Sequence, residues 1–407
     1  MARERIYVTG IGAVSAAGPD VDGIVGALAS GKTFLHPATR FETALKMPVG
    51  EVGLSDDELR SILGINDSVI SRTSLLGLKA VREAVRDHLQ RTGGLVPKRA
   101  VFISGTSVGG MDLSEEFWQA RRLDPDGTDP SCLSVHDPGA STLSIHANAP
   151  EDPESASFWS RVTGSTTIST ACSSAGNAIL LAARMLRAGI VDIAVAGGTD
   201  SLCRFTMNGF NSLRILDGEL CRPFDESRAG LNLGEGAGYL VLSAGQPEGA
   251  YCSLEGWGNA AEAYHQTAST PEGIGPGLSM ERALETAGLE AGSISFVNTH
   301  GTGTPVNDLA ESNAMLRIFG GNVPPFSSLK PYFGHTLGAS ESLEAAVVCR
   351  AIYDGDCSMM RSAGFSTPIQ DTGLVPYDGT LAVEPVNVLS SAFGFGGNCV
   401  SLIFSRL

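Results

Sequence analysis

The sequence lacks the features that define a membrane or secreted protein. No apolar run approaches the roughly 18 residues that a membrane-spanning helix needs, so we expect no membrane span. Residues 1–10 carry two basic side chains but not the apolar core of a secretion signal. We therefore expect a cytoplasmic protein.

Basic residues are also scarce. The chain has 28 Lys and Arg against 44 Asp and Glu, which gives a formal net charge of −16. Nucleic-acid binding requires a basic stripe that neutralises phosphates, so we expect no nucleic-acid partner.

Cofactor and metal motifs are missing too. The eight cysteines form no C-x-x-C pair, which argues against a zinc site or a disulfide framework and is typical of a reducing compartment. Gly10 and Gly12 follow a predicted strand as in a dinucleotide-binding turn, but Ser15 occupies the place of the third glycine. We therefore expect neither a metal nor another cofactor.

One cysteine stands in a distinctive position. Cys172 lies between a β-type run, 166–170, and a helical pattern, 173–187, that stops at Gly189. Free backbone N–H groups and the helix dipole favour an anion at such a junction, which should lower the thiol pKa. A lone cysteine is more often a buried structural residue, so this position alone does not establish a nucleophile.

Two of the seven histidines provide possible partners for that cysteine. His300 follows an apolar run and precedes a Gly-Thr-Gly-Thr segment, and His335 stands between glycines at the start of a predicted helix. Glycines on both sides let a substrate or another backbone segment approach closely. Each histidine alone would be an ordinary turn residue, but together with Cys172 they suggest a catalytic set.

These residues and several other motifs resemble one enzyme family. The chain is similar to β-ketoacyl-acyl-carrier-protein synthases, the condensing enzymes of the thiolase-like superfamily, and its Cys-His-His set resembles the elongating branch. Priming enzymes use Cys-His-Asn, and thiolases use a second cysteine. The motifs that carry the resemblance lie at 7–15, 105–110, 170–176, 195–200, 222–225, 234–238, 298–304, 327–339 and 393–398.

The resemblance implies an α/β, thiolase-like fold with central mixed sheets in a layered α/β/α/β/α arrangement. We expect two βαβ-rich halves, 1–247 with the cysteine and 248–407 with both histidines and a glycine-rich gating loop. The sequence pattern predicts strands at 6–9, 100–104, 166–170, 193–196, 239–243, 253–256, 295–298, 386–390 and 400–404.

The resemblance also implies a decarboxylative Claisen condensation. Cys172 would carry the acyl chain as a thioester, because a thiolate is a strong nucleophile and a thiol a good leaving group. Malonyl-acyl carrier protein would lose carbon dioxide to give an enolate, and His300 and His335 would stabilise its oxygen. Lys330 would tune the local electrostatics, through Glu311 in our interpretation.

Further roles come from the same comparison. The backbone N–H groups of Cys172 and Phe395 would form the oxyanion hole. Phe395, with Phe393, would gate the acyl pocket on glycine hinges. Val108 would line the acyl pocket.

Carrier-protein docking is harder to place because the carrier is acidic and this chain is acidic as well. A local positive patch must overcome the global field. Arg214 matches a docking arginine of the family, and Arg72 and Lys79 on a predicted helix are further candidates.

Three departures from the family leave the pathway and partner open. Segment 149–157 is acidic and suggests an altered interface, a loop over the pocket or a surface for an unlike subunit; Glu341 replaces a glycine and Cys399 a polar residue. We expect a homodimer, or a heterodimer with a chain-length-type subunit, in fatty acid or, more in keeping with these departures, specialised polyketide or polyene synthesis. The alternatives are a non-catalytic chain-length subunit and a thiolase or priming synthase that uses coenzyme A.

Overall fold

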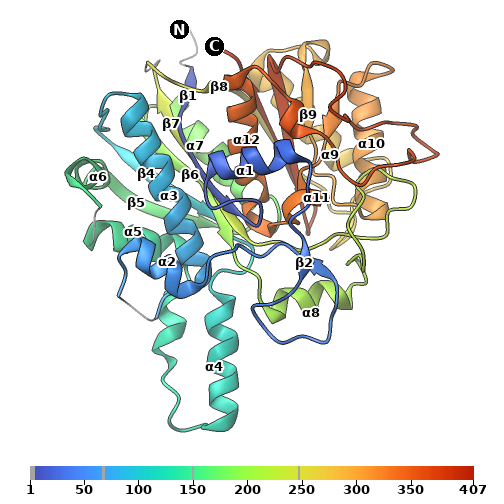
Figure 1. The fold of residues 1–407 in the computed structure, drawn as a ribbon. Coiled ribbons are helices and arrows are strands. Elements are labelled where there is room, and N and C mark those ends of the chain that lie inside the picture. Colours follow the sequence, from blue (N-terminus) through green and yellow to red (C-terminus); the bar gives the residue numbers. More distant parts are fainter. Residues whose placement is uncertain (1–4, 67–68, 149–150, 246–247) are drawn as a thin grey trace.

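The computed structural model describes residues 5–66, 69–148, 151–245 and 248–407. Within them, a ten-stranded mixed sheet has the order β10-β9-β11-β12-β8-β1-β7-β6-β4-β5 (Figure 1). Its strands are β1 (Ile6–Ser15), β4 (Ala100–Gly105), β5 (Val162–Ile168), β6 (Ile193–Asp200), β7 (Gly236–Ala244), β8 (Cys252–Ala261), β9 (Phe296–Asn298), β10 (Phe326–Ser327), β11 (Asn387–Gly394) and β12 (Asn398–Ser405). A separate ribbon pairs β2 (His36–Pro37) with β3 (Pro48–Val49).

The large sheet consists of two sets of five strands. From the centre outward, one set runs β1, β7, β6, β4, β5 and the other runs β8, β12, β11, β9, β10. When the five strands of each set are numbered along the chain, both sets have the same spatial order from the centre outward. Neighbouring strands at corresponding places in the two sets are also both parallel or both antiparallel. Among the described residues, the sets meet through three residue pairs between β1 and β8, from Ile6↔Leu254 to Val8↔Cys252.

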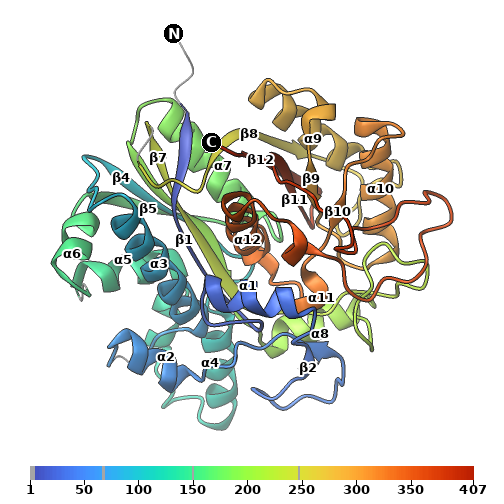
Figure 2. The ribbon, with the colours of Figure 1, turned by 45° about the horizontal axis from the view of Figure 1, so that its top comes forward.

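The helices form layers around these strands. They are α1 (Val21–Ser30), α2 (Asp56–Leu63), α3 (Arg72–Arg91), α4 (Met111–Leu123), α5 (Pro138–Asn148), α6 (Pro153–Trp159), α7 (Ser174–Arg187), α8 (Arg204–Ser212), α9 (Ile274–Ala287), α10 (Pro305–Phe319), α11 (Lys330–Phe333) and α12 (Ser340–Asp354). Helices α7 and α12 contact strands of both sets and each other, whereas α3 covers the first set and α9 the second (Figure 2). This arrangement confirms the expected layered α/β class.

The two central helices are built for burial on every side. Helix α12 buries nearly every residue from Ser340 to Ile352, as expected of a helix enclosed by protein. Helix α7 is rich in alanine, and a Cβ on its Gly176 would lie 2.4 Å from a Val400 methyl group. Small residues therefore let α7 lie close against β12 and set the position of its N-terminus.

The predicted strands all correspond to observed strands, with different ends. Strand β1 continues to Ser15 because it pairs along its length with β7 across a bulge after Val8. Strand β5 begins at Val162 and ends at Ile168, so the prediction of 166–170 was displaced toward the cysteine. Strand β10 was not predicted, since two residues are too few to form a pattern.

The acidic segment is partly described. Residues 149 and 150 lie outside the described residues, and Glu151 forms an ion pair with Arg86 at 2.8 Å. Asp152 caps α6 by accepting from the Ser155 N–H at 2.8 Å. Helix α6 packs against α3 and α5 and buries Trp159, so this segment is not a loop over the cavity described below.

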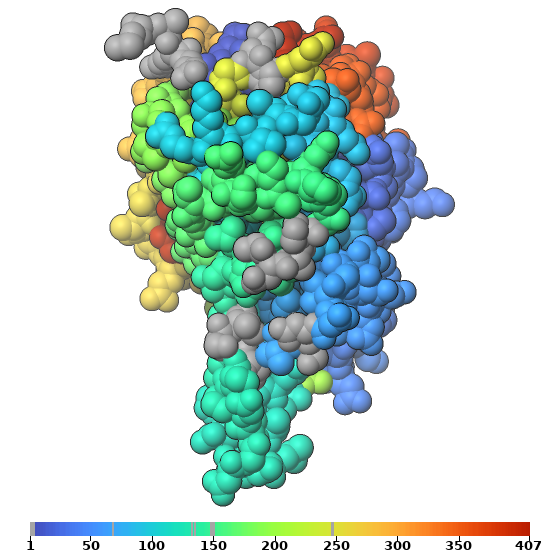
Figure 3. Space-filling model, turned by 90° about the vertical axis from the view of Figure 1, so that its left-hand side faces the viewer, coloured from blue at the N-terminus to red at the C-terminus, as the bar shows by residue number. Residues whose placement is uncertain are grey.

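Helix α4 and the segment after it extend beyond the rest of the molecule (Figure 3). Trp118 on this helix is 59% exposed, and Leu123 at its end is 90% exposed. Among the described residues, no helix is long and apolar enough to cross a membrane. No metal-binding group of three or more His, Cys, Asp or Glu side chains occurs in that part of the chain.

Candidate active site

Cys172 lies in a tight turn between β5 and α7. Its side chain is buried, and Ser173 at the N-cap directly precedes the helix. Ala171 has φ of +54°, a left-handed conformation that costs a residue with a Cβ about 1 kcal/mol. The turn holds this conformation because Ser174 Oγ accepts from the Thr170 N–H at 2.9 Å and donates to the Ala171 carbonyl.

His335 is the direct partner of Cys172. Its Nε2 lies 3.1 Å from Cys172 Sγ, and its Nδ1 lies 2.8 Å from Ser340 Oγ. The His335 N–H donates to the Asn232 carbonyl at 2.7 Å, which fixes the backbone beneath the ring. The second half of the chain thus supplies the group that can take the proton of a nucleophile from the first half.

His300 lies beside His335 without contacting the sulfur. The two rings meet edge to face with centroids 5.2 Å apart, and His300 contacts Phe393 at 5.5 Å. Glu311 on α10 accepts the N–H groups of His300 and Gly301, each at 2.8 Å. His300 Nδ1 is buried and has no hydrogen-bond partner among the described residues, while the residue itself lines the cavity described below.

The electrostatics of this site favour neutral groups. Burial lowers the pKa of His300 and His335 well below the usual value, and the Lys330 ammonium lowers both further. Burial also raises the pKa of Cys172 to about 12, although Lys330 opposes the shift. The expectation of a lowered thiol pKa was wrong, because removal of the thiolate from water outweighs the helix N-terminus.

Lys330 and Glu311 do not form the pair that we expected. Lys330 Nζ lies 2.8 Å from Glu344 Oε1, and both side chains are 1% exposed. The other oxygen of Glu344 accepts from Asn298 Nδ2 at 2.9 Å. Glu311 instead binds the backbone next to His300, and burial raises its pKa to about 8.

The glycine-rich turn between β11 and β12 lies over the cysteine. The N–H groups of Cys172 and Phe395 both point at Cys172 Sγ and stabilise its charged form. Gly396 and Gly397 have φ of +83° and +79°, which residues with a Cβ rarely adopt. The Phe395 ring stacks on Phe210 of α8 at 5.5 Å.

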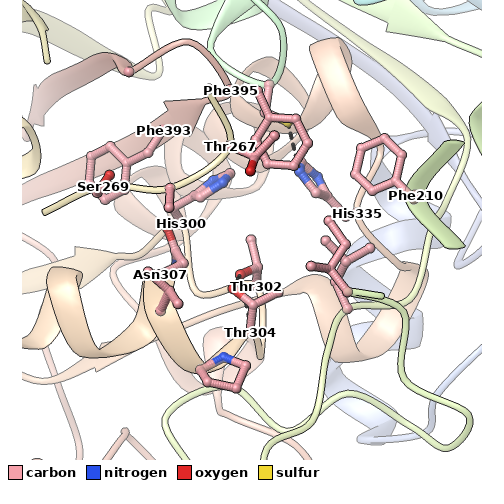
Figure 4. A pocket seen from close by; sticks show the side chains of 18 of the residues that line it. Phe210, Thr267, Ser269, His300, Thr302, Thr304, Asn307, His335, Phe393 and Phe395 are labelled. Carbon is pink, nitrogen blue, oxygen red and sulfur yellow. Dashed lines mark hydrogen bonds between the residues drawn. The ribbon is translucent and has the colours of Figure 1, made fainter. Parts of the chain in front are cut away.

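A cavity of about 320 Å³ leads to these groups (Figure 4). Its lining includes the apolar side chains of Phe210, Ile215 and Leu231 and the hydroxyl groups of Thr302 and Thr304. The other lining residues are Cys172, Arg214, Thr267, Ala268, Ser269, His300, Pro305, Val306, Asn307, His335, Phe393, Gly394, Phe395 and Gly397.

Some predicted site residues lie elsewhere. Val108 is half-buried and is not among the described residues that line this cavity. Arg72 was a wrong candidate for docking: it is 3% exposed and forms ion pairs with Glu235 and Asp56 at 2.6 Å. Lys79 is half-buried on α3, whereas Arg214 is exposed at the cavity.

Asp200 and Ser340 were missed in the sequence. Asp200 is buried at the end of β6 and accepts from Thr106 Oγ1 at 2.6 Å and the Gly338 N–H at 2.7 Å. It thereby ties the end of β4 to the turn after His335. Because Asp200 ends the 195–200 motif, the sequence could have indicated that it belongs to the site. No motif or pattern indicated the same for Ser340.

The two single-residue departures are both buried. Glu341 lies on α12, and burial together with the nearby Glu344 carboxylate raises its pKa well above the usual value. Cys399 lies at the start of β12, where burial raises the pKa of its thiol. Both groups therefore favour their neutral forms.

A buried thiol beside two imidazoles, under two converging backbone N–H groups in a thiolase-like fold, defines a thiol-dependent acyltransferase. Comparison with known proteins makes this assignment specific. The Beta-ketoacyl synthase, N-terminal domain, model matches residues 3–247, and the Beta-ketoacyl synthase, C-terminal domain, model matches residues 251–363. The chain belongs to the β-ketoacyl synthase family.

Individual relatives agree with this family. The chain is 31% identical to 3-oxoacyl-[acyl-carrier-protein] synthase 2 of Staphylococcus aureus strain N315, over 99% of this chain and 98% of that protein. The ishigamide ketosynthase/chain length factor structure matches with a TM-score of 0.88 and 27% identity over all of both chains. Ketosynthase ApeO in complex with its chain length factor ApeC, from Xenorhabdus doucetiae, matches with a TM-score of 0.78 and 30% identity over 99% and 98% of the chains.

Proposed function

We propose that this chain condenses an acyl group held on Cys172 with malonyl-acyl carrier protein, to give a β-ketoacyl-carrier protein and carbon dioxide. The observation that carries the proposal is the 3.1 Å contact between Cys172 Sγ and His335 Nε2, beside His300. The residues present need no metal or other cofactor for this reaction.

The first step is acyl transfer. His335 takes the thiol proton as Cys172 sulfur attacks the thioester carbonyl, and the N–H groups of Cys172 and Phe395 hold the resulting oxyanion. The carbon–sulfur bond of the carrier thioester then breaks, and the carrier thiolate receives the proton from His335. Because the resting thiol has a raised pKa, proton removal accompanies the attack.

The second step is decarboxylation and condensation. The malonyl carboxylate leaves as carbon dioxide, and its bonding electrons form an enolate whose oxygen accepts from His300 and from His335. For this step His335 takes the tautomer with the proton on Nε2, and Ser340 Oγ then donates to its Nδ1. The enolate carbon attacks the acyl carbonyl, and Cys172 leaves as a thiolate that takes up one proton. Neutral imidazoles suit this step because each can donate one N–H without a counterion.

Lys330 and Glu344 act as a fixed charge pair behind the histidines. Burial lowers the pKa of both imidazoles, the Lys330 ammonium lowers it further, and the same ammonium favours the Cys172 thiolate as it forms. Glu311 fixes the backbone of His300 rather than contacting substrate. We therefore assign Lys330, Glu344 and Glu311 as positioning residues.

The carrier protein docks near Arg214 in this proposal. Arg214 lines the cavity and lies two residues beyond α8, so a carrier held there could extend its thioester arm toward Cys172. An exposed arginine suits an acidic carrier, because local charge guides association even when the whole molecule is acidic. Buried Arg72 has no part in this docking.

We also propose a dimer, and favour an unlike partner of the chain-length type. Strand β5 is the terminal strand of the sheet, so one row of its backbone groups is open to pairing. Two similar structures contain a ketosynthase together with a chain length factor. These two structures, together with the chain's departures from the family, support a specialised polyketide or polyene pathway. In this proposal the enzyme works in the cytoplasm, and residues 1–247 and 248–407 are the two halves of one catalytic unit.

The competing assignments lack support in the site. A non-catalytic chain-length subunit has no use for a cysteine paired with a histidine under two N–H donors. A priming synthase would carry asparagine in place of His335, by the resemblance described above.

Intact-protein mass spectrometry tests the proposal. The chain is mixed with a panel of acyl-carrier proteins, alone and with a co-expressed chain-length-type partner, beside a Cys172→Ala control. We expect an acyl adduct on the wild type only. Condensation of malonyl-carrier protein by the Cys172→Ala variant would rule out this mechanism.

A further inference from the structure

A cluster of side-chain amides lies immediately behind the Cys172 turn, outside the cavity. Asn177 projects from the first turn of α7, Asn259 from β8, and Asn398 begins β12 directly after the glycine-rich turn. Three separate segments therefore meet at one point next to the nucleophile, and none of these amides takes part in the proposed chemistry.

Asn398 is the centre of the cluster. Its Oδ1 lies within hydrogen-bond distance of three donors: Asn177 Nδ2 at 2.7 Å, Ser173 Oγ at 2.9 Å and Asn259 Nδ2 at 3.1 Å. Asn259 Nδ2 also donates to Asn177 Oδ1 at 2.7 Å. One oxygen thus joins the start of β12 to the cysteine turn and to β8.

The contacts around Asn398 reach the nucleophile on one side. Ser173 is the next residue after Cys172, and its hydroxyl also lies 2.8 Å from the Thr170 carbonyl at the beginning of the same turn. Asn177 Nδ2 donates to Thr170 Oγ1 at 3.0 Å. Movement of Asn398 would therefore disturb both ends of the Cys172 turn.

On the other side, Asn398 is three residues from the oxyanion donor. A Cβ at Gly394 would lie 2.4 Å from the Thr170 carbonyl oxygen, so the β11–β12 turn is in direct contact with the cysteine turn. The outer face of the turn is held by backbone bonds from Gly396 N–H to Gln266 and from Glu262 N–H to Gly397. The glycines themselves offer no side chains to hold the inner face, so side-chain bonds there rest on Asn398.

We propose that Asn398 is a positioning residue for the oxyanion hole, which holds the Phe395 N–H at a fixed distance from the Cys172 N–H. Asn177, Asn259 and Ser173 supply the donors that hold Asn398 in place. The inference rests on the proposed acyl-transfer function. It implies that Asn398 affects reactions that form an oxyanion more strongly than reactions of the thiol alone, where the Phe395 N–H is a minor influence beside burial.

The experiment compares two reactions of Cys172. Acylation from an acyl-carrier protein forms an oxyanion, whereas alkylation by iodoacetamide forms none. We expect Asn398→Ala to slow acylation by about tenfold to 100-fold, below the 10²–10³-fold effect of deleting an oxyanion donor outright. Alkylation should change less than about threefold, because Cys172 Sγ keeps its contact with His335 and burial remains the main influence on its pKa.

Matched variants separate positioning from general damage. Asn398→Asp keeps an acceptor oxygen and should recover acylation to within about fivefold of the wild type. Asn387→Ala, at the opposite end of the β11–β12 hairpin, removes one Nδ2 hydrogen bond of 2.9 Å to Ser293 and should leave both reactions unchanged. Asn259→Ala removes one donor to Asn398 and serves if Asn398→Ala does not fold.

The outcomes are distinct. Equal slowing of acylation and alkylation, or no slowing of acylation in both Asn398→Ala and Asn259→Ala, would overturn the inference. Absence of acylation in the wild type would instead count against the proposed function. Loss of acylation in Asn387→Ala would show that the hairpin tolerates no lost amide bond, and would overturn the special role of Asn398.

Discussion

Lys330 Nζ and Glu344 Oε1 lie 2.8 Å apart in the interior, and each side chain is 1% exposed. A buried charge without a partner is costly, whereas a complete pair can be nearly neutral for stability. Lys330 also acts on both histidines and on Cys172. Burial is the larger influence on the pKa values of these three groups, and Lys330 is the charge that acts on all of them.

We predict that Lys330→Met or Glu344→Leu alone lowers the free energy of unfolding by about 3–5 kcal/mol. The double variant should lose less free energy of unfolding than the two single variants lose together, because it leaves no unpaired charge. Urea unfolding measures these values, with the exposed Arg406–Glu384 pair as a control whose removal costs at most about 1 kcal/mol. Strict additivity of the single effects would show that the two groups do not interact.

The raised thiol pKa predicts the pH dependence of Cys172 alkylation. Because the pKa is about 12, the thiolate fraction should increase about tenfold per pH unit from about pH 7 to about pH 10, without a plateau. Mass spectrometry of the Cys172 peptide after timed iodoacetamide treatment measures the rate. A plateau near pH 7 would reveal a preformed thiolate–imidazolium pair.

Replacement of each histidine should slow a different step of the reaction. His335 contacts Cys172 Sγ, so His335→Ala should slow acylation by about 10²–10⁴-fold. His300 makes no such contact, so His300→Ala should acylate at a similar rate but lose decarboxylation of malonyl-carrier protein. Adduct formation and release of labelled carbon dioxide measure the steps, and an equal loss of acylation in both variants would contradict this division.

Glu311 should make stability depend on pH. Its folded pKa of about 8 lies above the ordinary value of 4.5, so its contribution to stability is complete below about pH 4.5 and is lost as pH rises through about 8. The free energy of unfolding of Glu311→Gln should therefore rise relative to that of the wild type, by on the order of 3 kcal/mol between about pH 5 and about pH 8. A difference that stays constant across this range would show that Glu311 is ionised in the folded protein at both pH values.

Arg214 should affect the carrier and not the chemistry. Arg214→Glu should raise KM for acyl-carrier protein by about tenfold or more and leave acylation from a small acyl thioester unchanged. Lys79 was a second docking candidate, but it is half-buried on α3 and does not line the cavity, so Lys79→Glu is a matched charge reversal that should have little effect on either substrate. Equal effects of the two variants on the carrier would point to overall charge instead of a docking site.

Local sequence patterns predicted several elements and site residues of this protein. The apolar spacing from Ala178 to Leu186 and the stop at Gly189 predicted α7, and the β-type run before Cys172 predicted a strand there. The glycine contexts of His300 and His335 identified both rings that reach the cavity. These signals are contained within a few residues of sequence.

The errors arose from properties that depend on distant residues. The pKa of Cys172 is governed by burial, to which segments from both halves contribute. The partner of Lys330 lies on α12, and no local pattern distinguished Glu344 from Glu311. Arg72 begins a helix whose first turn is buried, and its place on a predicted helix did not reveal this burial. The repeated strand order leaves no clear trace in the sequence, because it requires the same topology and not the same residues.

The repeated strand order also gives the two reacting side chains equivalent places in the molecule. Helices α7 and α12 each join the third and fourth strands of their own set, and Cys172 and His335 each lie just before one of them. The loops at these equivalent places meet with Cys172 Sγ and His335 Nε2 3.1 Å apart, so one topology used twice supplies both a thiol and its imidazole.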